Sequence, residues 1–252
     1  ILAKSDLAPS FCFFPRFPGT ADDEITCSRD RSITGGGDER LGRGEPGFDQ
    51  QLDLARRLAA TASDDVGIDI VGLRAGERMR ASDLFDAMLV RSANDACRAL
   101  ADWHGGDQAG FVVKMNARAR ALGLADTRFG DACGHDLPDQ YSSARDLVVL
   151  ARAAMAQPLI AGTAARTEHR FSTRAGRAFH VRSTNALLGR FDGARGLKTG
   201  YTPGAGRCLI AVAERDGREV LAVLLHAPDR WWDTVGLLEL AFDEARRSDP
   251  PE

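Results

Sequence analysis

Lysine is scarce in this sequence and occurs only at Lys4, Lys114 and Lys198, so arginine carries most of the positive charge. The 33 basic residues are scattered among 36 acidic ones, and the net charge is −3. A nucleic-acid-binding surface needs its basic residues gathered in a patch or stripe. We therefore expect no nucleic-acid partner.

Long apolar runs are also absent. No stretch approaches the roughly 20 residues that a transmembrane helix needs, so we expect no transmembrane segment. The apolar stretch Phe11 to Phe14 is too short to be the core of a signal peptide, and Pro15 interrupts it at once. The sequence as given carries no export signal.

Metal-binding spacings are missing among both the cysteines and the five histidines, so we expect no metal and no cofactor. Free cysteines behave as small apolar residues, and we expect most of the five to fill space in the core. Their odd number leaves at least one unpaired. The five are Cys12, Cys27, Cys97, Cys133 and Cys208.

The chain has 252 residues, of which 44% are apolar, enough to bury a large core in one domain or two closely packed ones. Residues 1–50 differ from the rest because they combine prolines and a Gly35 to Gly37 run with few periodic apolar positions. We expect residues 1–50 to be irregular or disordered, residues 51–247 to fold, and residues 248–252 to form a tail.

Helical periodicity recurs through the middle of the chain. We expect a helix over residues 52–62, one that Ser82 caps and that runs to residue 90, and one that continues from residue 96 to Gly105. Two more are expected, over residues 111–122 and from Ser142 or Ser143 to Pro158. The polar residues Ser92, Asn94 and Asp95 interrupt the second and third, which on its own indicates a capped junction between two helices.

Strand patterns dominate the last third. Residues 169–181 alternate like an exposed hairpin, and Asp216-Gly217 predicts a tight turn between apolar runs at 208–213 and 220–225. A strand is also expected over residues 196–202. The closing helix begins at Trp231, and we expect Trp231 and Trp232 to pack against the sheet.

Lys198-Thr199-Gly200 combines three useful properties at one strand edge. Lys198 supplies a positive charge, Thr199 supplies a hydroxyl donor, and Gly200 lacks the side chain that would keep another backbone from pairing there. This combination suits an extended peptide that ends in a carboxylate. Taken alone, the triplet is equally typical of a solvated lysine before a turn.

An ordered series of motifs resembles the serine D-alanyl-D-alanine carboxypeptidases, the low-molecular-mass penicillin-binding proteins of the active-site-serine β-lactamase and transpeptidase superfamily. The resemblance covers roughly residues 71–242. Its order is far more specific than any one of its motifs. The series comprises Ser92-Ala93-Asn94-Asp95-Ala96, Phe111 with Met115-Asn116, Leu122-Gly123, Thr127 and Phe129, Tyr141-Ser142, Asn185-Ala186-Leu187-Leu188, and Gly196 to Thr202 with Ala205-Gly206.

The resemblance implies an α+β fold with an antiparallel sheet flanked by helices and a helical subdomain, here lacking the amino-terminal strands. Ser92 and Lys198 should then face one cleft between the two parts. Ser92 would relay protons, and Asn94 would bind the substrate amide. Lys198 and Thr199 would hold the terminal carboxylate beside Gly200, and the Tyr201 N–H would be an oxyanion donor.

The substrate implied by the resemblance is a peptidoglycan stem peptide ending in D-Ala-D-Ala, cleaved through an acyl-enzyme ester, with β-lactams as further ligands. Family members act outside the cytoplasm, so a periplasmic or secreted location is expected.

The family's first element, Ser-x-x-Lys, is not found, because Ile1, Phe111 and Arg195 precede the three lysines by three positions. We find neither the nucleophile nor its base and expect this polypeptide to be inactive. Two explanations fit the change of character near residue 50. One is a truncated or misread amino-terminal part, which we favour, and the other is a pseudoenzyme that keeps the peptide groove.

Other functions remain open at this point. The chain could be a non-catalytic module that binds D-Ala-D-Ala or penicillin, or a β-lactamase-like hydrolase. A β-lactamase would also need a deacylating glutamate, for which Glu168 is the one candidate in the hairpin region. An unrelated structural protein would place Ser92 and Lys198 far apart.

Overall fold

The computed structural model describes residues 51–53 and 70–247. The expectations for residues 1–50 and 248–252, and most of the helix expected over residues 52–62, lie outside the described residues. The prediction of a helix is wrong for its first residues, because β1 (Gln51–Asp53) is a strand that pairs antiparallel with β2 (Arg78–Arg80). Pairing with a distant segment has outweighed the local helical pattern.

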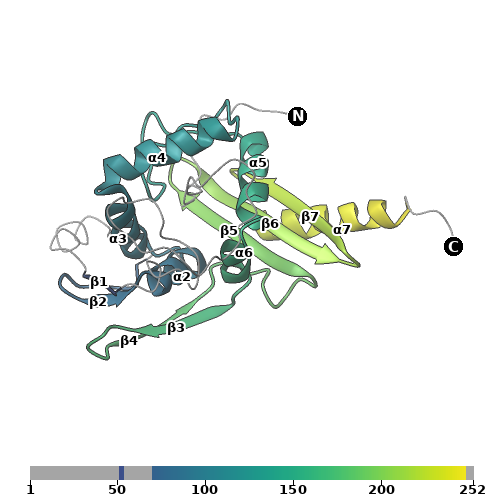
Figure 1. Cartoon of the computed structure of the whole chain (residues 1–252). Helices are drawn as coiled ribbons and strands as arrows, with labels where there is room; N and C mark the ends of the chain where they lie inside the picture. Colours follow the sequence, from purple (N-terminus) through teal and green to yellow (C-terminus); the bar gives the residue numbers. More distant parts are fainter. Residues whose placement is uncertain (1–50, 54–69, 248–252) are drawn as a thin grey trace, which may run out of the picture.

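The helical part consists of α2 (Ala81–Arg91), α3 (Asn94–Gly105) and α4 (Gln108–Ala121), with the hairpin of β3 (Glu168–Ser172) and β4 (Ala178–Arg182) alongside (Figure 1). One hydrophobic core joins the helices to the hairpin. Its members include Leu84, Phe85, Met88, Leu100, Phe111, Phe171 and Val181.

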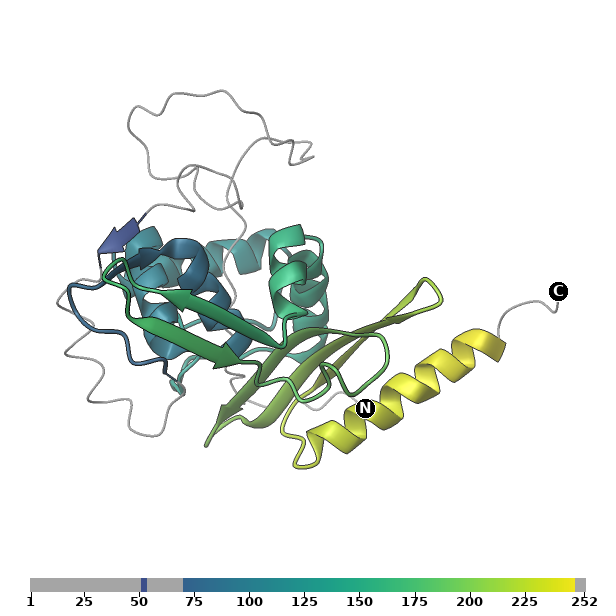
Figure 2. The same ribbon diagram turned by 90° about the horizontal axis from the view of Figure 1, so that it is seen from below.

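The main sheet has three described strands, β5 (Ala194–Thr202), β6 (Gly206–Arg215) and β7 (Arg218–Leu224), paired antiparallel in that order. The sheet lies between α5 (Ala144–Met155) and α6 (Pro158–Ala164) on one side and α7 (Arg230–Arg247) on the other (Figures 1 and 2), and alternate residues of β6 face these two layers. Ile210 and Val212 pack against α5 and α6, whereas Leu209 and Ala211 pack against α7. Burial on both faces explains why β6 is an almost unbroken apolar run.

This arrangement confirms the expected α+β class, an antiparallel sheet flanked by helices beside a helical part. Among the described helices, none alone is long and apolar enough to cross a membrane. The pair α5 and α6, bent by 103° at its junction, reaches that length and composition only when taken together.

Several expected helix ends are confirmed and others are wrong. Ser143 caps α5, where its hydroxyl accepts the Asp146 N–H at 3.2 Å. Ser82 does not cap α2, because the helix begins at Ala81 and Ser82 lies buried within it. Pro158 begins α6 as its first residue, a position where the missing proline N–H leaves no hydrogen bond unmade.

The cysteine expectation is wrong for two of the described residues. Cys97 on α3 and Cys133 in the loop between α4 and α5 form a disulfide, with their Cα atoms 5.9 Å apart. Cys208 is free and buried, as expected of a core-filling residue. Cysteine spacing alone cannot reveal a pair that the fold brings together.

The two tryptophans at the start of α7 behave differently. Trp231 packs against the core between α7 and the sheet, as expected. Trp232 was expected to do the same, but it lies 80% exposed. Neighbouring positions on a helix point about 100° apart, so only one of the two can face the sheet.

Candidate functional site

Ser92 lies at the junction between α2 and α3. It closes α2 in a left-handed conformation, with φ of 61°, and Asn94 is the first residue of α3. The Asp95 carboxylate fastens this junction to the preceding loop, because it accepts the N–H groups of Gly72 and Leu73, each at 2.9 Å. Ser92 is therefore presented from a fixed turn.

Lys198 on β5 reaches across to this junction. Its ammonium group donates hydrogen bonds to Ser92 Oγ and, at 2.8 Å, to the Thr199 carbonyl oxygen. Only 3% of Lys198 is exposed. The structure thus brings together the two side chains that the sequence predicted to share one cleft.

Thr199 is buried next to Lys198 and has a hydroxyl partner of its own. Its Oγ1 lies 2.7 Å from Thr184 Oγ1, and the Thr184 N–H donates to the Val90 carbonyl oxygen at 3.1 Å. Asn185, part of the predicted motif, starts the next turn by accepting the Leu187 N–H at 3.0 Å. The segment around Thr184 therefore connects α2 to β5.

Arg230 at the start of α7 is a site neighbour that the sequence did not indicate. Its guanidinium donates to the Gly200 carbonyl oxygen at 2.9 Å and to the Cys208 carbonyl oxygen at 3.1 Å. Burial, together with the nearby charge of Arg207, lowers the pKa of Arg230. No motif surrounds Arg230, and only the fold brings it under β5.

Tyr201 and Asn94 complete the predicted set. The Tyr201 side chain is exposed, so the protein leaves that part of β5 open to solvent. Asn94 is partly buried in the first turn of α3, and its carbonyl oxygen lies 4.0 Å from Cys133 Sγ. The disulfide therefore lies directly beside the junction that carries Ser92.

The loop of residues 130–140 connects α3 to the turn between β5 and β6. The disulfide attaches it to α3, and Asp136 accepts the Thr202 hydroxyl at 2.5 Å and the Gly204 N–H at 2.8 Å. This loop therefore forms a strap between the helical part and the sheet.

A partly buried acid–histidine pair, Asp131 and His135, stiffens this strap. Burial alone would raise the pKa of Asp131. Hydrogen bonds from the His135 ring and from the N–H groups of His135 and Cys133 outweigh that effect and lower the pKa to about 2. Asp131 therefore stays ionised over most of the pH range.

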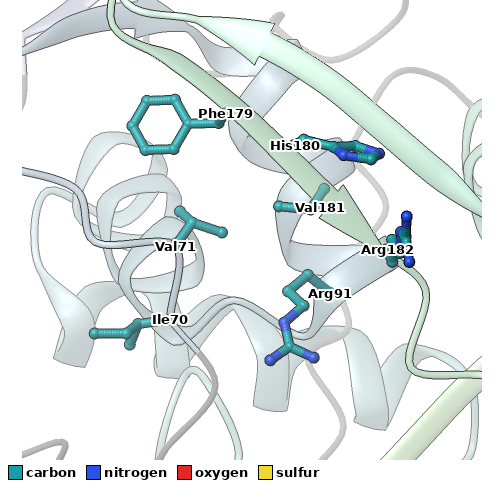
Figure 3. A pocket seen from close by; sticks show the side chains of 7 residues that line it. All are labelled: Ile70, Val71, Arg91, Phe179, His180, Val181 and Arg182. Atoms are coloured by element: carbon teal, nitrogen blue, oxygen red, sulfur yellow. The ribbon is translucent and has the colours of Figure 1, made fainter.

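A cavity of about 330 Å³ lies on the helical side of the molecule, where Ile70 and Val71 face Arg91 and the strand β4 (Figure 3). Ser92 and Lys198 are not among its lining residues. The cavity is therefore separate from the group that the sequence predicted.

Glu168, the candidate for a deacylating base, lies in strand β3 rather than in a loop. Its carboxylate accepts a hydrogen bond from His180 at 2.8 Å, which lowers the pKa of Glu168. A carboxylate with a lowered pKa is a weaker base, so nothing at this position favours the β-lactamase alternative.

Comparison with known sequences agrees with this geometry. The sequence profile of the D-alanyl-D-alanine carboxypeptidase family matches residues 48–229. D-alanyl-D-alanine carboxypeptidase DacB2 of Mycobacterium tuberculosis is 34% identical over 201 residues, which cover 76% of this chain and 68% of that protein. Carboxypeptidase DacD of Escherichia coli is 40% identical over 165 residues, and the match spans 41% of its length.

Solved structures show the same relationship. The Streptomyces K15 DD-transpeptidase superposes with a TM-score of 0.73 at 27% identity, covering 78% of this chain and 80% of that one. The D-alanyl-D-alanine carboxypeptidase of Mycobacterium tuberculosis superposes with a TM-score of 0.65 at 31% identity, over 78% and 84% of the two chains. This protein therefore belongs to the D-alanyl-D-alanine carboxypeptidase family and has its β-lactamase-like fold.

Proposed function

We propose that this chain recognises peptides that end in D-Ala-D-Ala, as the peptide-binding part of a serine-type carboxypeptidase. The observation that carries the proposal is the hydrogen bond between Lys198 and Ser92 at the junction of the helical part and the sheet. It places a buried ammonium group and a hydroxyl at one point beside strand β5.

Strand β5 offers the peptide an edge. In the described sheet β5 pairs with β6 on one side only, so its other backbone edge is available for a further strand. An extended peptide can add to such an edge through main-chain hydrogen bonds, and Gly200 presents no side chain against it. The Lys198 ammonium and the Thr199 hydroxyl would then hold the terminal carboxylate.

The remaining residues would serve the acyl transfer that the family performs. Ser92 would pass a proton toward the leaving amine, and Asn94 would bind a substrate amide. The Tyr201 N–H would donate to the oxyanion. None of the three lysines follows a serine by three positions, so we expect this polypeptide to bind the peptide without turning it over.

The proposed ligands are the D-Ala-D-Ala end of peptidoglycan stem peptides and β-lactams, and the proposed location is outside the cytoplasm. The disulfide between Cys97 and Cys133 supports that location, since stable disulfides form mainly in oxidising compartments.

Calorimetry can test the proposal with an N-acetylated tripeptide that ends in D-Ala-D-Ala and with its L-Ala-L-Ala counterpart. The D,D peptide should bind and the L,L peptide should not. Lys198→Met should weaken binding about ten- to a hundredfold, because it removes a hydrogen bond to a charged group.

Lys114→Met is the matched control. Lys114 lies on α4, and its ammonium group likewise donates to a backbone oxygen, that of His104, at 2.9 Å. This variant should bind like the parent. Absence of binding by the parent chain, or equal losses in the two lysine variants, would refute the proposal.

A further inference from the structure

Thr184 is not one of the predicted site residues, yet it contacts both α2 and β5, the two elements that carry Ser92 and Lys198. Its hydroxyl meets that of Thr199 at 2.7 Å, and its N–H donates to Val90, two residues before Ser92. Thr184 is thus a bridge between α2 and β5.

The backbone around Thr184 is held on three successive residues. The Ser183 N–H donates to the Thr167 carbonyl oxygen at 2.8 Å, the Thr184 N–H donates to Val90, and the Asn185 N–H donates to Ser183 Oγ at 3.1 Å. A β-branched side chain on a fixed backbone has few rotamers available. The Thr184 hydroxyl is therefore preset against Thr199.

The direction of the hydrogen bond between the two hydroxyls decides what Thr199 can do. Each threonine hydroxyl has one proton to donate. If the Thr199 hydroxyl donated its hydrogen bond to Thr184, the lone pairs of Thr199 Oγ1 would face an incoming carboxylate and repel the carboxylate. If Thr184 donates instead, the Thr199 proton is free to point to the carboxylate.

We propose that Thr184 is a positioning residue whose hydroxyl donates to Thr199 Oγ1 and thereby aims the Thr199 proton at the carboxylate end of the peptide. The inference rests on the proposed function. Because the oxygen of Thr199 already accepts one bond, the bond that it donates is also strengthened. Thr184 and Thr199 together favour a free carboxylate over a carboxamide. The carboxamide NH₂ group needs a hydrogen-bond acceptor, and the Thr199 hydroxyl in this orientation offers it a donor instead.

The test compares the affinity of the same peptide as its free acid and as its terminal carboxamide, measured by calorimetry. Thr184→Val keeps the shape of the side chain and removes the donor. The acid-to-amide affinity ratio should fall about three- to tenfold in this variant, the range of one ordinary hydrogen bond. Thr184→Ser keeps the donor and should restore the ratio.

Thr173→Val is the matched control, since the Thr173 hydroxyl accepts the Arg177 N–H within the turn of the β3–β4 hairpin. Its ratio should equal that of the parent. Thermal unfolding midpoints show whether the valine variant still folds. If it does not, Thr184→Ala removes the same hydroxyl with a smaller side chain.

Two failures are distinguishable. If the parent chain binds neither peptide, the proposed function is wrong. If the parent binds the acid and Thr184→Val leaves the ratio unchanged, or weakens acid and amide by the same factor, the role given to Thr184 is wrong and the proposed function stands.

Discussion

Lys198 donates a hydrogen bond to Ser92 although 106 positions separate them in the sequence. Ser92 closes α2 and Lys198 lies within β5, so this bond crosses from the helical part to the sheet. A buried ammonium group requires such partners, because desolvation without hydrogen bonds is costly. The hydrogen bond between Lys198 and Ser92 therefore also helps to join the two parts of the protein.

Benzylpenicillin provides the first prediction. A serine hydrolase of this family would be acylated by it, but the sequence contains no Ser-x-x-Lys to supply the nucleophile and its base. We expect intact-mass spectrometry to show no stoichiometric adduct on this polypeptide after incubation with the drug. An adduct would contradict the expected inactivity, and peptide mapping would then locate the serine that forms the ester.

The disulfide provides the second prediction. Reducing Cys97–Cys133 opens a cross-link between residues 36 positions apart, and the free energy of unfolding should fall by roughly 2–5 kcal/mol. Guanidinium unfolding with and without a reductant measures this change. A Cys97→Ser/Cys133→Ser variant is the control, and the reductant should not change its free energy of unfolding. Equal responses from the two proteins would show that the effect lies elsewhere.

The meeting of Ser92 and Lys198 could be predicted because both residues belong to short motifs. Ser92 and Lys198 carry recognisable neighbours, and their meeting followed from the ordered resemblance. The two apolar runs likewise placed β6 and β7 correctly, with Asp216-Gly217 between them.

The residues that hold the site were not predictable in the same way. Arg230 contacts β5 from α7, and Thr184 contacts it from the position just before the Asn185 motif; neither residue belongs to a predicted motif itself. Cys97 and Cys133 were expected to fill the core, because only the folded loop shows that they face each other. Ser82 illustrates a local error, since a good capping residue was buried one position inside the helix.

Asp131 provides the third prediction, a dependence of stability on pH. Its pKa is lowered from 3.8 to about 2, so the folded state gains stability above the unfolded pKa and loses it as the pH falls through the folded one. The difference corresponds to about 2 kcal/mol. Asp131→Asn should therefore lower the free energy of unfolding by about that amount at neutral pH.

The loss in Asp131→Asn should shrink between about pH 4 and pH 2 and vanish below it, because the parent then carries a neutral acid as well. Urea unfolding of both proteins across this range measures the difference. A difference that stays constant with pH would show that the charge of Asp131 is irrelevant and that packing alone is affected.

Arg215 provides the last prediction, because it ties α7 to the sheet in two ways. Its guanidinium donates to both carboxylate oxygens of Glu239, at 2.8 and 2.9 Å, and it lies 4.4 Å from the centre of the Phe191 ring and 4.9 Å from that of Phe242. Lysine keeps the charge but loses the planar fork and the stacking. Arg215→Lys should lower the free energy of unfolding by about 1–2 kcal/mol.

Arg246→Lys, a substitution on α7, is the control for Arg215→Lys. The Arg246 side chain is 54% exposed and pairs with Asp243 at the surface, where an ion pair contributes little. Its effect on unfolding should stay below about 0.5 kcal/mol. Because Arg230 on α7 donates to Gly200, loosening this helix should also weaken peptide binding in Arg215→Lys and not in Arg246→Lys. Equal unfolding and binding in the two variants would mean that α7 is held by its apolar contacts alone.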